Sequence, residues 1–132
     1  MFGIFNTTTI PALEQTLSFS QKRHELLAGN LANLDTPGYR AKDLDVGDFQ
    51  NALAESIENH QKIMGTGQPL TRDDIRSGPR EAMEPVVYHD QSDVSLEQQV
   101  SEVAKNEHMH ALAITTMRSQ FALLRAAITE RA

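Results

Sequence analysis

The side chains best suited to chemistry in this chain are its five histidines. His108 and His110 lie two residues apart, which sets them about 200° apart around a helix, so they cannot bind one metal ion from the same face. The sequence contains no cysteine, which excludes disulfides, thiolate ligands and a cysteine nucleophile. We therefore expect no metal site.

Carboxylates form two further groups that could bind an ion or transfer a proton, Asp43, Asp45 and Asp48 and then Asp90 and Asp93. Both groups lack the glycine and the roughly twelve-residue spacing of a calcium loop, so we expect helix caps and solvated surface. The chain also has no glycine-rich phosphate loop, serine elbow or nucleotide fingerprint. The pattern predicts no enzyme, no cofactor and no small-molecule substrate.

The charge balance narrows the class of partner. The 132 residues include 18 acidic and 12 basic side chains, a formal net charge of -6, which would repel a phosphate backbone. There is no run of about eighteen apolar residues, and the first residues lack a basic start, an apolar stretch and a cleavage site. We expect no nucleic-acid partner, no membrane-spanning segment and no ordinary cleaved secretion signal.

The first element that could position a site is a helix, indicated by a heptad pattern near the start of the chain. Its apolar positions, three and four residues apart, are Ile10, Leu13, Leu17, Leu27, Leu31 and Leu34, with Ser20 and His24 in the remaining two. This spacing indicates an amphipathic helix. Pro11 suits a first helical turn, and Thr36 is turned away from helical geometry by Pro37. The sequence predicts an N-terminal helix within residues 10–34.

A second and longer heptad pattern ends the chain. Its positions are Leu96, Val100, Val103, Ile114, Met117, Phe121, Leu124 and Ile128, with Glu107 and His110 in the polar positions. Asp93 or Ser95 can cap this helix, and acidic residues near its start match the positive end of the helix dipole. The sequence predicts a C-terminal helix over residues 94–130.

The middle of the chain, residues 35–93, reads as a turn, a short helix and an arm. A short amphipathic helix is predicted over about residues 47–61, with Asp45 or Asp43 as its cap. Residues 64–85 are rich in glycine and proline, the composition of a loop or extended arm. Because an arm of that length is unusual in a compact domain, we expect it to order against a partner.

The two heptad stripes predict the fold class. It is mainly α, with two long terminal helices pairing as a coiled coil, a short middle helix and a long extended or flexible arm. A second apolar column flanks the first, with Ala12, Phe19 and Leu26 on one helix and Met109 and Leu123 on the other. A face that wide suits more than one neighbour, which favours assembly. The alternative is a small self-contained bundle in which the short helix forms a third wall.

His24 and His110 interrupt the two seams. Such residues can act as a pH switch or as polar side chains that set helix register, and we favour the second. Placing His24 opposite His110 in an antiparallel pair brings every other seam residue against a seam residue. The pairs then include Leu13 with Phe121, Leu17 with Met117, Ser20 with Ile114, Leu27 with Glu107 and Leu31 with Val103.

The most distinctive segment is residues 27–40, Leu-Ala-Gly-Asn-Leu-Ala-Asn-Leu-Asp-Thr-Pro-Gly-Tyr-Arg. Asn30 and Asn33 can hydrogen-bond the backbone at a helix end. Proline followed by glycine suits the two central positions of a type II turn, whose second residue needs a positive φ. This turn would return Tyr39 toward the helix as an anchor.

This segment resembles the N-terminal signature of bacterial flagellar rod and hook proteins, in which an asparagine-rich helix end runs into threonine-proline-glycine-tyrosine. Residues 90–128 resemble the C-terminal part of the same family. Gly29 stands where a better helix former is usual, and Gln91-Ser92 replaces a glycine-asparagine pair. Hook and distal-rod members insert large β-rich domains between the terminal helices, so a chain this short is most similar to the proximal-rod subunits.

The resemblance implies a structural subunit of the flagellar basal-body rod, exported by the flagellar type III machinery and polymerised in the periplasm into a torque-transmitting shaft around the export channel. Its partners would be further copies, sibling rod subunits, the membrane-embedded ring and the export gate. The expected interface residues are Leu17, Leu27, Leu31, Val100, Val103, Met117, Phe121 and Leu124 on the helices, and Asn30, Asn33, Thr36, Pro37, Gly38 and Tyr39 in the turn. The rival reading is a soluble coiled-coil adaptor or export chaperone, which would not need the asparagine-rich turn.

Overall fold

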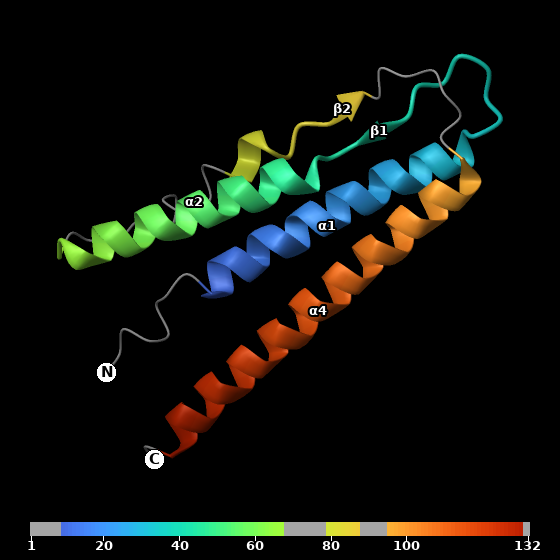
Figure 1. The fold of residues 1–132 in the computed structure, drawn as a ribbon. Coiled ribbons are helices and arrows are strands. Elements are labelled where there is room, and N and C mark those ends of the chain that lie inside the picture. The colour runs from blue at the N-terminus through green and yellow to red at the C-terminus, as the bar shows by residue number, and fades with distance from the viewer. Residues whose placement is uncertain (1–8, 68–78, 88–94, 131–132) are drawn as a thin grey trace.

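The computed structural model describes residues 9–67, 79–87 and 95–130 of the chain. In chain order its elements are α1 (Thr9–Ala32), β1 (Lys42–Asp43), α2 (Val46–Gly65), β2 (Val86–Val87) and α4 (Leu96–Thr129) (Figure 1). A short helical turn at 79–81 precedes β2. The mainly α fold with two long terminal helices and a shorter middle helix confirms the predicted fold class. None of the described helices is long and apolar enough to cross a membrane.

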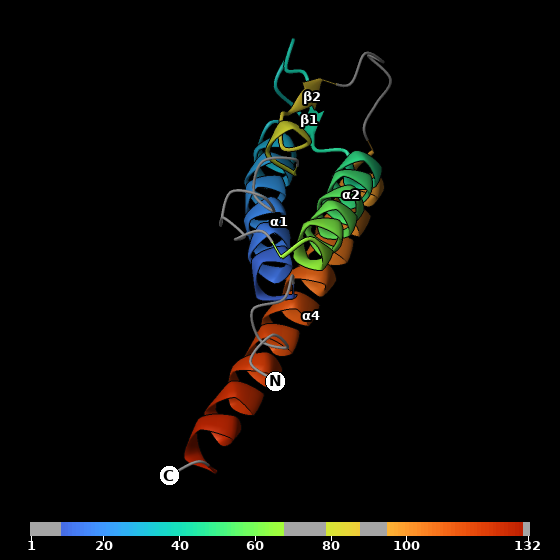
Figure 2. The same cartoon turned by 90° about the vertical axis from the view of Figure 1, so that its left-hand side faces the viewer.

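The three helices lie along one another. Figure 1 shows α1 and α4 side by side and running in opposite directions, with α2 antiparallel to α1. The view from the left-hand side, Figure 2, shows that α4 continues well past the start of α1. β1 and β2 form a short antiparallel ladder at the end of the molecule where α1 finishes and α4 begins, with Lys42 opposite Val87.

The two later helices begin at caps that the sequence offered. Asp45 accepts a hydrogen bond from the Asp48 backbone N–H at 2.9 Å and caps α2. Ser95 accepts one from the Gln98 N–H at 3.2 Å and caps α4. The described residues do not include Asp90 and Asp93, which were also expected as caps or surface. Helix α2 runs on to Gly65, past the predicted end near 61, because no proline or glycine interrupts it earlier.

The apolar core lies between α1, α2 and the segment that precedes β2. It consists of Phe19, Leu44, Phe49 and Met83, with Leu26, Val46, Leu53, Ala82 and Met109 packed around it. The rings of Phe19 and Phe49 stack with centroids 4.0 Å apart. The helix α2 therefore forms a third wall, which is the arrangement that the alternative of a small bundle describes.

The last third of the predicted arm, residues 79–85, packs on the chain itself and does not need a partner to order it. Met83 is buried, and its carbonyl accepts a hydrogen bond from the Lys22 ammonium at 2.7 Å. Pro79 is also fully buried. Residues 79–85 therefore order on the chain's own helices, because apolar side chains among the prolines and glycines find a core there. Residues 68–78 lie outside the described residues.

The buried faces of the paired helices differ from the predicted seam. The buried residues are Gln15, Phe19, Ser20, Arg23, Leu27 and Asn30 on α1, and Gln99, Asn106 and Ala113 on α4. Of the predicted positions, Leu31 and Val100 are 39% and 52% exposed, whereas Leu27 is fully buried. A pattern based on apolarity misses this face, because polar side chains that find partners can be buried at small cost.

The register within the chain also differs from the prediction. Ser20, expected opposite Ile114, instead lies 2.8 Å from the Nδ1 atom of His110 through its hydroxyl. The Ser20 carbonyl accepts a hydrogen bond from the Asn106 amide at 2.8 Å. The direction of pairing is antiparallel as expected, but α4 is shifted along α1 by about one helical turn or more. Polar pairs of unlike residues set the register, and not two facing histidines.

Candidate assembly surfaces

The turn after α1 is organised by one buried amide. Asn30 donates to the Lys42 carbonyl at 2.7 Å and accepts from the Lys42 N–H at 3.0 Å, so its side chain pairs with the β1 backbone as another strand would. The same oxygen accepts from the Tyr39 hydroxyl at 3.3 Å, and the amide nitrogen reaches the Gln99 side chain at 3.3 Å. Asn30 therefore joins α1, the turn, β1 and α4.

The reverse turn at Pro37-Gly38 has the predicted type II geometry. Gly38 has a φ of +76°, and the Tyr39 N–H donates to the Thr36 carbonyl at 3.2 Å, which closes a type II turn. Asn33 donates from its side chain to the Gly29 carbonyl at 2.8 Å and so finishes the helix. Tyr39 folds back over the helix end as predicted, with its hydroxyl oxygen 3.6 Å from where a Cβ at Gly29 would lie.

A buried ion network lies about two helical turns further along the helix pair. The Arg23 guanidinium donates to both oxygens of Asp43 at 2.8 Å and to Glu102 at 2.7 Å. Arg23 and Asp43 are 5% and 6% exposed, and Lys105 pairs with Glu102 at the surface at 2.6 Å. The network links α1, β1 and α4 through planar, charge-assisted hydrogen bonds.

The network shifts the acid–base properties of its members. Hydrogen bonds from Lys105 and then from Arg23 hold the pKa of Glu102 below its usual value of 4.5. The hydrogen bond to Asp43 raises the pKa of Arg23, so the guanidinium stays charged. These side chains form a structural lock, because their donors and acceptors are used within the chain.

The residues predicted for assembly fall into distinct environments. Leu27 is fully buried within the chain, and Leu17, Val103, Met117 and Leu124 are half-buried. In the turn, Asn30 is buried and Asn33 half-buried, whereas Thr36, Pro37, Gly38 and Tyr39 are exposed. Leu31 and Val100 are exposed near the same end of the molecule. The structure thus brings the turn residues together and leaves part of the predicted helix face uncovered.

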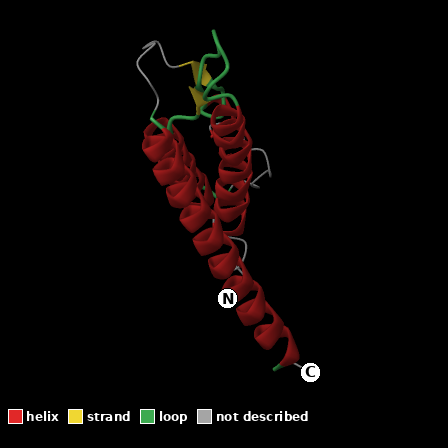
Figure 3. Ribbon diagram, turned by 90° about the vertical axis from the view of Figure 1, so that its right-hand side faces the viewer, coloured by secondary structure: helices red, strands yellow, loops and turns green. Residues whose placement is uncertain are grey.

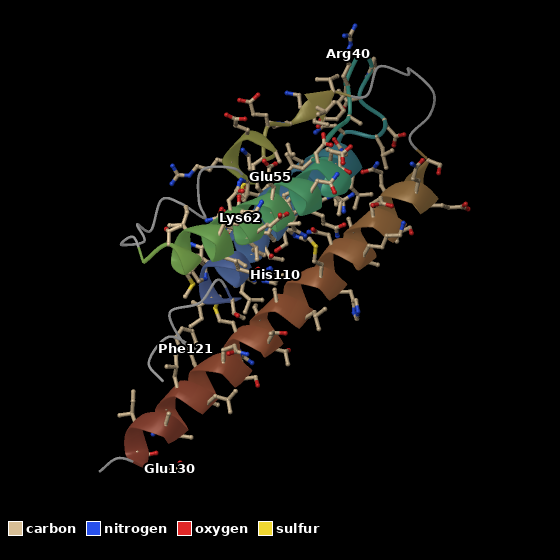
Figure 4. The ribbon with its side chains drawn as sticks, turned by 60° about the vertical axis from the view of Figure 1, so that its left-hand side comes forward. Arg40, Glu55, Lys62, His110, Phe121 and Glu130 are labelled. Carbon is tan, nitrogen blue, oxygen red and sulfur yellow. The ribbon has the colours of Figure 1, made fainter. Side chains whose placement is uncertain are left out.

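The last part of α4 carries the largest uncovered apolar side chains. Phe121, Leu123 and Ile128 are 52%, 55% and 70% exposed. Figure 4 shows Phe121 and Glu130 on the stretch of α4 that continues beyond α1, and Figure 3 shows the same projection from the opposite side. An exposed apolar helix of this kind marks a surface that can bind another protein.

A groove lies between α1 and α4 at mid-height. It has a volume of about 530 Å³ and is lined by Ser20, Gln21, His24, Glu25, Asn106, Glu107 and His110. Among the described residues no three histidine, aspartate or glutamate side chains are grouped to hold a metal ion. The groove can therefore bind by hydrogen bonds and charge.

Sequence reasoning missed the polar side chains that lock the helix pair. Arg23 and Asn30 are seven residues apart on α1, and Gln99 and Asn106 are seven apart on α4. Residues one heptad apart share a helix face, so two polar heptad stripes of this kind were a visible signal. The apolar heptads on the same two helices give a stronger pattern, which masks these polar stripes.

Several flagellar basal body rod proteins are similar to this chain in amino-acid sequence. Over 46 residues the chain is 46% identical to the flagellar basal body rod protein FlgB of Proteus mirabilis strain HI4320, covering 35% of this chain and 31% of that protein. It is 33% identical to FlgB of Yersinia enterocolitica over 54% of this chain and half of that protein. It is 25% identical to FlgB of Bacillus subtilis strain 168 over 92% of this chain and 93% of that protein.

The matched segments thus span a third to a half of the first two relatives, and nearly all of the third at lower identity. No family model matches the chain, and no solved structure matches it significantly. All three relatives are named as rod proteins of the flagellar basal body. The chain therefore resembles the flagellar basal-body rod proteins, and FlgB in particular.

Proposed function

We propose that this rod protein polymerises through its two terminal helices into the proximal part of the rod, the shaft that transmits torque around the export channel. The single observation that carries the proposal is the set of exposed apolar side chains around α4 beyond α1. Phe121 and Ile128 lie on one side of the helix and Leu123 on the other, and all three are at least half exposed. Apolar side chains of that size favour burial by about 1.5–3 kcal/mol each, so a neighbour that covers them is stabilised.

The proposal divides the chain into a part that folds by itself and a part that joins subunits. The Arg23 network and the Asn30 hydrogen bonds fix α1, β1 and α4 relative to one another. The rigid pair can then present the exposed turn residues and the end of α4 to neighbours in a constant geometry. A torque-bearing shaft needs such pre-organised contacts, because loose side chains lose entropy when they are ordered.

The partners follow from the same proposal. They are further copies of this chain, sibling rod subunits, the membrane-embedded basal-body ring and the export gate. Assembly takes place in the periplasm after export by the flagellar type III machinery. The role is mechanical, and the proposal assigns no reaction to the chain.

Deletion of the gene tests the proposal. We expect cells without it to lose flagella and swimming while growing at the normal rate, and the full-length gene to restore both. A triple variant Asn33→Ala, Pro37→Ala and Gly38→Ala should fail to restore them. Flagella in the deletion strain would overturn the rod function. Restoration by the triple variant would favour the coiled-coil adaptor or chaperone, for which the turn is not needed.

A further inference from the structure

The groove between α1 and α4 contains an acceptor that the chain itself does not use. Asn106 is 2% exposed, and its side-chain oxygen Oδ1 has no hydrogen-bond partner among the described residues. Its amide nitrogen donates to the Ser20 carbonyl at 2.8 Å, which fixes the orientation of the amide, since a flip would set two oxygens against each other. This oxygen is enclosed within the chain, so the contacts open to a docked element lie at the exposed edges of the groove.

The charge of the groove identifies the kind of donor. Glu25 and Glu107 are exposed at its edges, and no lysine or arginine is among the described residues that line it. A guanidinium fits these exposed carboxylates, because its planar fork can donate two hydrogen bonds to one carboxylate. The volume of about 530 Å³ admits several side chains of a docked element.

A matching basic stripe lies on the projecting part of α4. Arg118, Phe121, Arg125 and Ile128 follow one another at spacings of three, four and three residues, which puts them on one face. All four are exposed, and neither arginine makes an ion pair with a described residue. Figure 4 shows that this stretch of α4, around Phe121, extends away from the level of His110 in the groove.

We infer that the groove of one copy receives the arginine stripe of the projecting α4 of a second copy, with Glu25 and Glu107 facing Arg118 and Arg125. The inference rests on the proposed function, since it names the partner of a surface on the rod subunit. A second copy is the occupant because its α4 carries two exposed arginines on one face, opposite in charge to the two exposed glutamates of the groove. The stripe supplies those charges next to the apolar side chains that need cover.

Cross-linking in cells tests the inference, and the absence of cysteine from the chain makes the test clean. One tagged copy carries Gln21→Cys at the edge of the groove, and a differently tagged copy carries Ala122→Cys in the stripe. We expect an inter-copy disulfide after mild oxidation. Glu25→Arg with Glu107→Arg on the first copy should lower the yield by about tenfold or more, because like charges then face each other.

Charge restoration separates a direct pairing from a loss of folding. Adding Arg118→Glu with Arg125→Glu to the second copy should return the disulfide to nearly its original yield. Glu55→Arg with Glu81→Arg, on exposed positions away from the groove, makes the same charge change and should leave the yield intact. No disulfide in the unmodified pair, or no recovery in the swapped pair, would overturn the inference. Flagella in a strain without the gene would instead overturn the proposed function, and leave the disulfide result to stand on its own.

Discussion

The two ends of the helix pair use their side chains in opposite ways. At the turn end, Asn30 makes hydrogen bonds to α4, β1 and Tyr39, and Arg23 joins two carboxylates. At the far end, Phe121 and Ile128 on α4 are more than half exposed. Specific polar contacts hold the turn end in a single geometry, even though Leu96 and Val100 are also exposed there. The hydrogen bonds between α1 and α4 described above involve α4 only from Gln99 to His110, so the far end of α4 is left open to a neighbour. The comparison predicts that substitutions at the turn end weaken folding, and those at the far end weaken assembly.

The largest loss of folding stability is expected at Arg23. Arg23→Met keeps the apolar stem but leaves the carboxylate of Asp43 buried without its partner, which should cost about 3–5 kcal/mol in the free energy of unfolding. Denaturant unfolding followed by circular dichroism measures this. Lys105→Met removes a surface ion pair from the same network and should cost about 1 kcal/mol or less. Equal effects of the two variants would show that burial of the network is unimportant.

The next largest effect is expected at Asn30. Asn30→Ala leaves both backbone groups of Lys42 without their partner, at a cost of about 2–3 kcal/mol. Hydrogen exchange at the Lys42 amide should accelerate along with the fall in stability. Asn33→Ala removes one bond to a helix carbonyl and should cost about 1 kcal/mol. An unchanged exchange rate at Lys42 in Asn30→Ala would contradict the role of the buried amide.

A pair of glycines tests the turn itself. Gly38 has a φ of +76° and open space around a Cβ, so Gly38→Ala should destabilise by about 1 kcal/mol through backbone strain alone. Gly65 also has open space and ends α2 without a positive φ, so Gly65→Ala should stabilise by about 0.5–1 kcal/mol. Thermal melting of both variants gives the two signs. A shift in the same direction for both would refute the turn geometry.

The pH dependence of folding stability tests the contribution of Glu102 at the turn end. Because hydrogen bonds lower the folded pKa of Glu102 below 4.5, its stabilisation is complete above that pH and is lost as the pH falls through the lower folded pKa. We expect the free energy of unfolding of the wild type to exceed that of Glu102→Gln by about 1 kcal/mol or less at pH 7, and the difference to be smaller at pH 3. Unfolding curves at both values measure it. A difference that grows on acidification would have the wrong sign for this pair.

The same contrast explains what the sequence could and could not predict. The helices and the type II turn at Pro37-Gly38 follow from local chemistry, since apolar spacing, caps and a proline restrict nearby residues directly. The buried polar lock depends on Arg23 meeting Asp43 and Glu102, which are far apart in the chain. No local rule pairs such residues, so the register and the buried face were predicted wrongly while the elements themselves were predicted correctly.

The smallest expected effect on folding is at Phe121, and there the expected effect on assembly is greatest. Phe121→Ser removes a side chain that is 52% exposed, so the free energy of unfolding should stay within about 0.5 kcal/mol of wild type. If a neighbouring subunit covers this ring, the same variant should fail to restore flagella to the deletion strain. Met64→Ser, at an apolar residue 38% exposed on α2, serves as the control and should restore them. A stable Phe121→Ser variant that restores full swimming would show that the projecting end of α4 is not an assembly surface, and a large loss of stability would show that the chain itself covers it.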